Sequence, residues 1–331
     1  MMMTSVKIAK PTWKTKMKFF DLFAGIGGFR VGLEAHGHEC VGSCEIDKYA
    51  RKIYGKNFGH EPEYKDVRDI DPKDIQDFDI LCAGFPCQSF SIVGNRKGFD
   101  DKRGNLFFEI IRLAKEKRPP ILLLENVKGL LSHEKGETFR IMLQTLDECG
   151  YDVSWQLLNS RYFVPQSRER LYIIANLRGS SGRKILPLGK VSKRNDKSRK
   201  ELYATDECSS TLTATYWKGY GGGRPMIKED KKVQMTYRSN TNSNMKERVQ
   251  DRDETWTLTS NSNDFTITDD HRVRKLTPIE CERLQGFADD WTKGISDTQR
   301  YKCIGNAVTT KVVEYIVGHW NDDDLTQVES E

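Results

Sequence analysis

Long hydrophobic runs are absent from this chain of 331 residues. No apolar stretch approaches the roughly 20 residues that span a bilayer. Residues 1–17 carry lysines but lack the apolar core of a secretory signal. We therefore expect a cytoplasmic protein with no membrane partner. In that compartment the eight cysteines should be reduced thiols rather than disulfides.

Zinc-ligand spacing is also lacking. His36, His38, Cys40 and Cys44 lie close together in the sequence, but their spacing matches no common zinc pattern, and the alternation fits a strand that follows a turn. We expect no metal.

A strong excess of one charge is the third absence. The formal net charge is +5, from 53 Lys and Arg against 48 Asp and Glu, which is too mild to establish a polyanionic partner. The segment 178–200 is locally basic, with Asp196 as its one acidic residue. It is either a solvated linker or a segment that follows the phosphates of a nucleic acid.

What is present is an alternation of apolar runs and helical stretches over the first 180 residues, typical of a parallel sheet wrapped by helices. From Arg178 to about His271 the pattern dissolves into Gly, Ser, Asn, Thr and charged residues. Regular structure returns at Thr277, which with Glu280 forms a predicted capping box. The predicted strands are 17–23, 39–45, 79–83, 121–124, 151–158 and 171–175, and the predicted helices are 28–36, 49–58, 106–117, 138–149 and 306–319.

Two of the predicted strands end in reactive groups. Gly84-Phe85-Pro86-Cys87-Gln88 places a thiol in a stiff loop after one apolar run, and Glu125 follows a second run. Because both strands belong to one predicted sheet, we expect the thiol and the carboxyl group at the same edge. The alternative for Cys87 is a buried structural cysteine, which packs as a small hydrophobic residue.

The first predicted strand leads into a glycine turn at Ala24–Gly28, where backbone can approach a ligand closely. Its spacing does not match the dinucleotide fingerprint Gly-x-Gly-x-x-Gly. Glu45 is placed to accept hydrogen bonds from ribose hydroxyls, and Asp66 could receive an adenine amino group. These pieces suit a nucleoside cofactor without a pyrophosphate, such as S-adenosylmethionine; a purely structural turn is the alternative.

Five blocks, taken in order, resemble the motifs of bacterial and phage cytosine-C5 DNA methyltransferases. The resemblance covers about 1–178 and 271–318. It implies an α/β fold: a Rossmann-like S-adenosylmethionine-dependent sheet with helices on both faces, over 1–178 and completed by 272–331. A small, irregular, β-rich target-recognition domain would occupy 179–271. The blocks are Asp21–Gly28, Pro86–Phe90, Glu125–Val127, Gln166–Arg170 and Gly305–Val308.

The resemblance also implies a mechanism. The thiolate of Cys87 would add to carbon 6 of a cytosine flipped out of the duplex, while Glu125 stabilises N3. Arg168 and Arg170, two residues apart on an extended segment, would hold the cytosine O2 and steady the catalytic groups. The segment 91–103 resembles the loop that closes over the flipped base.

Contacts to the ligands follow from the same resemblance. At position 46 related enzymes often carry an aromatic residue against the adenine, whereas this chain has Ile46, so we expect weaker cofactor binding. Thr257-Leu258, or alternatively Thr211-Leu212, would organise a recognition loop. The predicted cofactor contacts are Phe23, Ala24, Gly25, Ile26, Gly27, Gly28, Glu45, Ile46, Asp66, Val67, Pro86, Leu106 and Asn306, and the predicted DNA contacts are Gln88, Ser91, Arg103, Thr257 and Leu258.

The sequence therefore predicts an enzyme that moves a methyl group from S-adenosylmethionine to carbon 5 of cytosine in a specific double-stranded DNA sequence. We expect a monomer that protects DNA from a cognate restriction endonuclease. Three alternatives stay open: a tRNA cytosine-C5 methyltransferase, a catalytically idle DNA-binding relative, and an NAD-linked oxidoreductase.

Overall fold

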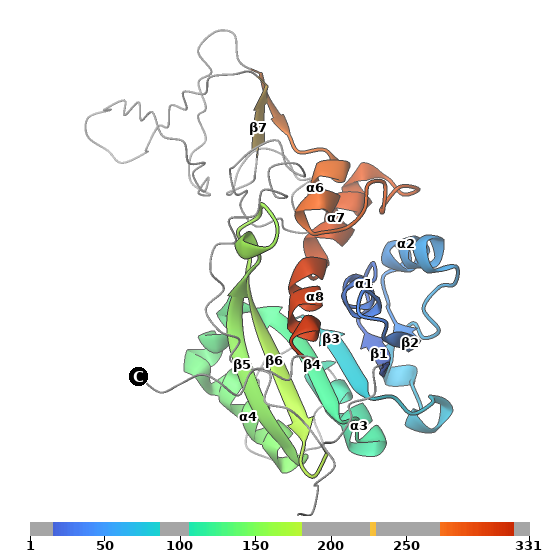
Figure 1. Ribbon diagram of the computed structural model, residues 1–331, viewed down its shortest axis with the longest axis vertical. Helices are drawn as coiled ribbons and strands as arrows, with labels where there is room; N and C mark the ends of the chain where they lie inside the picture. The colour runs from blue at the N-terminus through green and yellow to red at the C-terminus, as the bar shows by residue number, and fades with distance from the viewer. Residues whose placement is uncertain (1–15, 87–105, 181–225, 230–271, 321–331) are drawn as a thin grey trace, which may run out of the picture.

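A six-stranded sheet in the order β2-β1-β3-β4-β6-β5 forms the centre of the protein (Figure 1). The computed structural model describes residues 16–86, 106–180, 226–229 and 272–320. Each strand predicted in the first 180 residues is found, with ends shifted by a few residues. The strands are β1 (Lys18–Leu22), β2 (Glu39–Cys44), β3 (Ile80–Gly84), β4 (Ile121–Val127), β5 (Tyr151–Asn159) and β6 (Glu169–Leu177).

The sheet is mixed, so the expectation of a parallel sheet is wrong at one end. β1 to β4 pair in parallel, but β6 runs antiparallel to both β4 and β5. The reason is the connection: residues 160–168 join β5 to β6, and this is shorter than the dozen or so residues that a parallel crossover requires. The reversed strand lies beside β4, the strand that carries Glu125.

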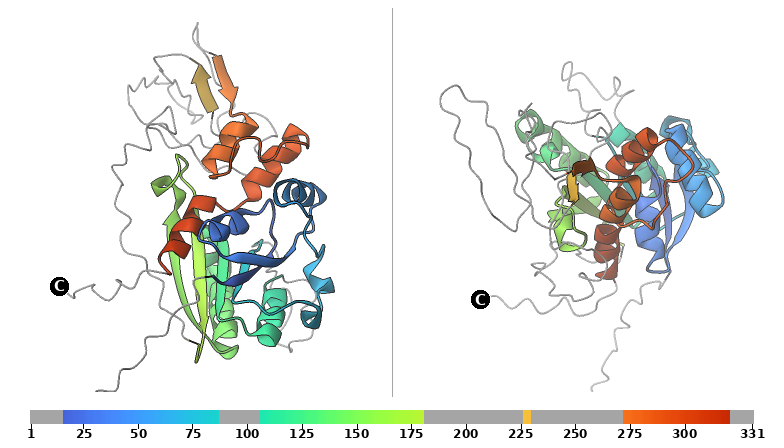
Figure 2. Two further views of the ribbon diagram at one scale, coloured as in Figure 1. Left: turned by 45° about the vertical axis from the view of Figure 1, so that its right-hand side comes forward. Right: turned by 90° about the horizontal axis from the view of Figure 1, so that it is seen from above.

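Helices cover both faces of the sheet (Figures 1 and 2). Neighbouring residues of β1 belong to different layers: Phe19 is part of the apolar cluster that includes α1 and α8, whereas Phe20 is part of the cluster that includes α3 and α4. Both faces are therefore buried, as expected for this fold class. The helices of these layers are α1 (Gly28–Glu34), α3 (Leu106–Lys117), α4 (Glu137–Glu148) and α8 (Thr310–Gly318).

Close packing between α1 and α8 depends on glycine. A Cβ added at Gly28 would lie 2.6 Å from Cγ1 of Val308, and one added at Gly32 would lie 2.6 Å from Val313. Real Cβ atoms do not approach so closely, so the two segments could not meet with larger residues here. The start of the chain and its last described helix thus form one layer.

A third apolar cluster lies over the turn that follows β1. Ile26 shares this cluster with Ile53, with Leu284 of α6 and Ile304 of α7, and with Phe287, which follows α6. The capping box predicted at Thr277 and Glu280 is present. The remaining helices are α2 (Lys48–Phe58), α6 (Pro278–Leu284) and α7 (Asp297–Asn306), with short 3-10 turns η1 (Val67–Asp69), η2 (Pro72–Asp74), η4 (Lys128–Leu131), η5 (His133–Gly136) and η6 (Ser160–Tyr162).

The single helix predicted over 306–319 is wrong in its first turn. α7 ends at Asn306, Ala307 is extended with φ −67° and ψ 147°, and α8 begins at Thr310. The break is held by side chains distant in sequence, because Arg168 and Gln285 donate to the carbonyl oxygen of Ala307.

The predicted target-recognition domain, 179–271, lies mostly outside the described residues. Within it the structure describes β7 (Met226–Glu229), which pairs antiparallel with β8 (Arg272–Lys275). In the described part of the chain no helix is long and apolar enough to cross a membrane, and no group of three or more His, Cys, Asp or Glu side chains could hold a metal ion.

Asp21 is a buried carboxyl group in β1. Its side chain is fully shielded from solvent, and neither oxygen has a hydrogen-bond partner of ordinary geometry among the described residues. Burial raises the pKa of Asp21 to about 8, while the charge and the backbone amide of Arg30 oppose this increase. Asp21 is therefore neutral in the folded protein at pH 7.

This burial predicts how stability depends on pH. An unfolded aspartate has a pKa of about 3.9, so between about pH 4 and pH 8 the folded state binds the extra proton and stability falls as pH rises. Asp21→Asn should remove this dependence. Between pH 5 and pH 8 the melting temperature of the variant should rise relative to wild type by roughly 2 to 8 °C. Scanning fluorimetry would measure the melting temperatures. If they changed with pH in the same way in both proteins, Asp21 would not have the raised pKa.

Candidate active site

Glu125 lies inside β4 rather than after it. The predicted strand ended at residue 124, but β4 continues to Val127, and Glu125 pairs with Gly84 of β3 on one side and Tyr172 of β6 on the other. Its backbone is therefore fixed by ladders on both sides. A carboxyl group needs such a rigid support if it is to face a substrate atom at a set distance.

Arg170 contacts this carboxyl group from the reversed strand. Its Nε lies 3.1 Å from Oε1 of Glu125, and the two side chains are 16% and 12% exposed. Burial raises the pKa of Glu125, while Arg170 and then Arg168 lower it by their charge. The net direction is upward, so Glu125 keeps its proton to higher pH than an exposed glutamate and can donate a hydrogen bond.

Arg168 lies beside the same carboxyl group but has a different set of hydrogen bonds. Its guanidinium donates to the carbonyl oxygens of Gly305 (3.2 Å) and Ala307 (3.1 Å), and burial lowers its pKa to about 9. The two residues flank Asn306, a predicted cofactor contact. Arg168 thereby ties the C-terminal segment to the strand that carries Arg170.

Asn126, the residue after Glu125, also ties two segments of the chain together by a side-chain hydrogen bond to a backbone carbonyl. Its amide donates to the carbonyl oxygen of Phe85 at 2.9 Å, and its own oxygen accepts from the backbone of Val127 at 2.8 Å. This fastens the end of the chain segment that leads, two residues later, into Cys87. Cys87 lies outside the described residues, as do the predicted DNA contacts Gln88, Ser91, Arg103, Thr257 and Leu258.

The glycine turn adopts left-handed backbone at three positions. Phe23, Gly25 and Gly27 have φ of 56°, 57° and 89°. A Cβ at Gly25 would have no neighbour nearer than 4.0 Å, whereas one at Gly27 would lie 2.3 Å from the ring of Phe58. Phe23 and Gly25 are therefore the partly open residues of the turn. The others predicted to bind cofactor, Ala24, Ile26, Gly27 and Gly28, have little exposed surface.

Glu45 organises the edge of this turn. Its carboxylate accepts from the backbone N–H groups of Gly25 (2.8 Å) and Asp47 (2.7 Å), and burial raises its pKa. Each carboxylate oxygen has two acceptor sites, so both oxygens keep capacity for the predicted ribose hydroxyls.

Ile46, between these two acidic residues, is 67% exposed. A large aliphatic side chain open to water beside a polar turn is what a site for an apolar ring would present. The sequence reasoning missed two neighbours: Asp47 caps α2, and its carboxylate accepts from Nζ of Lys302 at 2.6 Å. Asn306 is exposed one turn further along α7. Only the Asp47 cap could have been found from the sequence.

The other predicted cofactor residues are dispersed around this edge. Asp66 caps η1 and its carboxylate pairs with Arg68, so an adenine amino group would share it. Val67 is buried, Pro86 is exposed, and Leu106 is partly buried at the start of α3.

Comparison with known proteins gives the family. The profile of the C-5 cytosine-specific DNA methylases matches residues 17–321. The chain belongs to this family. It is 36% identical over 323 residues to the type II methyltransferase M.HhaI of Haemophilus parahaemolyticus, covering 91% of this chain and 93% of that protein. It is 40% identical over 316 residues to M1.ScrFI of Lactococcus lactis subsp. cremoris, covering 91% and 77%.

Solved structures show the same fold at low sequence identity. S. pombe Dnmt2 methyltransferase superposes with a TM-score of 0.61 at 19% identity, covering 94% of this chain and 100% of that one. The predicted α/β methyltransferase fold is confirmed, with the mixed sheet as its correction. The chain is a DNA cytosine-5 methyltransferase, and S-adenosylmethionine is its methyl donor.

The exposed Ile46 gives a prediction about cofactor affinity. Ile46→Trp should place an aromatic face where an aliphatic one stands, and such ring contacts contribute about 0.5 to 1.5 kcal/mol. We expect the Kd for S-adenosylmethionine to fall by roughly 2- to 10-fold in calorimetric titrations. Ile46→Leu, which keeps an aliphatic surface, is the control and should bind as wild type does. Unchanged or weaker binding by a folded Trp variant would show that residue 46 does not face the adenine.

Proposed function

We propose that this enzyme methylates carbon 5 of a flipped cytosine in a specific double-stranded DNA sequence through a covalent adduct with Cys87. The observation that carries the proposal is Glu125, a carboxyl group with a raised pKa held between two strands. The hydrogen bond from Asn126 to Phe85 supports the placement of the Cys87 loop next to it.

The residues divide the reaction as follows. The Cys87 thiolate forms a bond to C6 of cytosine, and the displaced electron pair moves towards N3, where protonated Glu125 donates. Carbon 5 then has the electron density needed to take a methyl group. Loss of the C5 proton to a base and cleavage of the C6–S bond release the product and the thiolate. Arg170 stabilises the negative charge that Glu125 acquires when it gives up its proton.

The turn at Phe23 and Gly25, the carboxylate of Glu45, the exposed face of Ile46 and the exposed Asn306 would hold the cofactor. When bound, S-adenosylmethionine supplies an electrophilic methyl group on a sulfonium. The protein's part is to hold that methyl group at the same edge of the sheet as Glu125. Arg168 supports this placement because its hydrogen bonds fix the backbone on both sides of Asn306.

The recognition part of the proposal rests on sequence organisation. Residues 1–178, completed by 272–331, would form the catalytic domain, and 179–271 would read the DNA sequence. We infer a monomer whose biological role is protection from a cognate restriction endonuclease, as the type II relatives suggest.

The covalent step is tested by trapping. Wild-type enzyme with S-adenosylmethionine should form a denaturation-resistant complex on duplex DNA that contains 5-fluorocytosine. The fluorine replaces the C5 proton and cannot be removed by a base, so the C6–S bond is not cleaved. Cys87→Ser should abolish the complex. Cys40→Ser, which alters a cysteine next to Tyr54 away from the site, is the matched control and should still form it. An adduct that persists in Cys87→Ser would overturn the assignment.

Substrate class is tested in parallel. Tritium from labelled cofactor should enter double-stranded DNA and not tRNA. Transfer to tRNA alone would reverse the proposal, and bisulfite sequencing of plasmid from expressing cells would identify the methylated site.

A further inference from the structure

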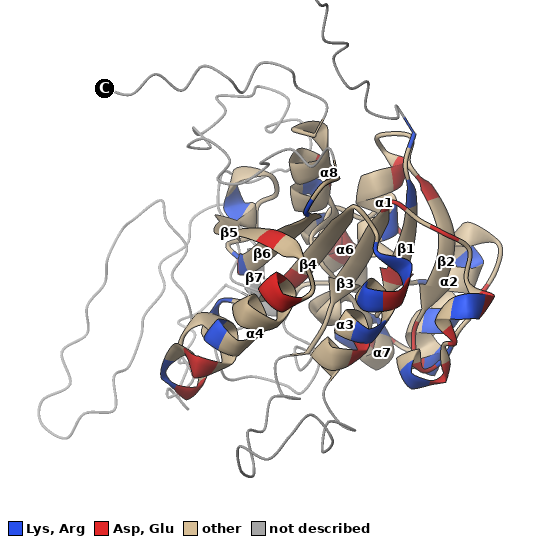
Figure 3. Cartoon of the chain, turned by 90° about the horizontal axis from the view of Figure 1, so that it is seen from below, with Lys and Arg blue, Asp and Glu red and all other residues tan. Residues whose placement is uncertain are grey.

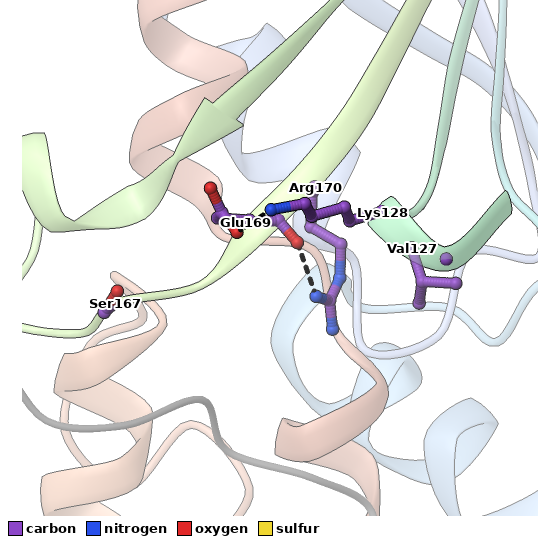
Figure 4. A pocket seen from close by; sticks show the side chains of 6 residues that line it. Val127, Lys128, Ser167, Glu169 and Arg170 are labelled. Atoms are coloured by element: carbon purple, nitrogen blue, oxygen red, sulfur yellow. Dashed lines mark hydrogen bonds and ion pairs between the residues drawn. The ribbon is translucent and has the colours of Figure 1, made fainter. Parts of the chain in front are cut away.

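A cavity of about 370 Å³ opens next to the contact between Arg170 and Glu125. Val127 at the end of β4 and Lys128 and Gly129 of η4 line one side, and Ser167 before β6 with Glu169 and Arg170 at its start line the other (Figure 4). The proposed reaction uses Arg170 but gives no role to Lys128 or Glu169.

The two cations of this cavity have different partners. Arg170 contacts buried Glu125 and donates to the backbone carbonyl of Glu169 at 2.8 Å. Lys128 instead extends towards Glu169, the other charged residue of the lining, and its Nζ lies 2.8 Å from that carboxylate (Figure 4). Arg170 is thus fixed within the protein, whereas Lys128 is held by a surface carboxylate.

Separating Lys128 from Glu169 costs little free energy. Their side chains are 57% and 47% exposed. Exposed pairs of this kind contribute only about 0 to 1 kcal/mol, because water solvates both partners well when they separate. The four-carbon stem of lysine lets the ammonium move to another anion without backbone change.

The charged residues of the described helices do not provide a second source of positive charge at this cavity. Helices α3 and α4 each carry both acidic and basic residues, and the basic helix α2 lies by β2, at the edge of the sheet opposite β5 (Figures 1 and 3). An anion that enters the cavity therefore depends on local cations. The anion that accompanies a flipped cytosine is the backbone phosphate of its own nucleotide or of the next one.

We propose that Lys128 is a phosphate-contact residue for the target strand, which Glu169 holds over the cavity until DNA replaces the carboxylate. This inference rests on the proposed function, because it takes the cavity as the entry for the flipped nucleotide. Lys128 positions the substrate and takes no part in bond making.

The exchange predicts opposite effects of the two partners on DNA affinity. With duplex DNA carrying the site identified by bisulfite sequencing, Lys128→Ala should raise the Kd by roughly 5- to 20-fold and lower the slope of log K against log salt by about 1. Glu169→Gln should lower the Kd by roughly 2- to 5-fold, because the lysine no longer has to leave a carboxylate. The Kd for S-adenosylmethionine should not change in either variant.

The double variant separates exchange from general repulsion. On the Lys128→Ala background, Glu169→Gln should have no further effect on the Kd for DNA. The matched control is the pair of Lys16 and Glu39, at 2.9 Å with 63% and 48% exposure at the amino end of the sheet, where the same substitutions should leave the Kd for DNA unchanged.

Two results would overturn the proposal. Equal weakening by both single variants would make the ion pair a purely structural link between β4 and β6. Persistent tightening by Glu169→Gln without the lysine would reduce Glu169 to a source of repulsion. Either result would leave methylation by the wild-type enzyme in place, whereas failure of the proposed function would show as no methylated cytosine at all.

Discussion

The contact between Arg170 and Glu125 is the interaction on which the proposed active site depends. β6 runs against β4 and places Arg170 opposite Val127, two residues from Glu125, so that a cation from one strand meets a carboxyl group on the other. Burial raises the pKa of Glu125, and the charge of Arg170 limits how far this pKa rises. A freely solvated glutamate would be ionised at neutral pH and could not donate to a ring nitrogen.

The rest of the edge is arranged around that contact by backbone anchors. Asn126 donates to the carbonyl group of Phe85, two residues before Cys87 in the sequence, and Arg168 donates to the carbonyl groups on both sides of Asn306. The second anchor joins residues more than 130 positions apart. Because α8 also packs on α1 through glycine, the first and last described segments form one layer, and loss of the C-terminal segment would remove Asn306, a proposed cofactor contact.

Much of this arrangement could be predicted from the sequence, for physical reasons that are visible at particular residues. Apolar runs identified the strands, ordered motifs identified the family, and the same motifs led to Glu125 as the proposed catalytic carboxyl group. The reversal of β6, the break at Ala307 and the pair of Asp47 and Lys302 were not predicted. Each depends on contacts between distant segments, which local periodicity does not report. The short link 160–168 was the one local sign of the reversed strand.

In the proposed mechanism Glu125 acts in its protonated form, and this is best tested by the pH dependence of single-turnover methyl transfer. With saturating DNA and cofactor, the wild-type rate constant should rise as the thiol ionises and fall again at higher pH as Glu125 loses its proton. In Glu125→Gln the rate constant should be lower and the falling limb absent. A falling limb that survives in that variant would show that a group other than Glu125 loses the proton.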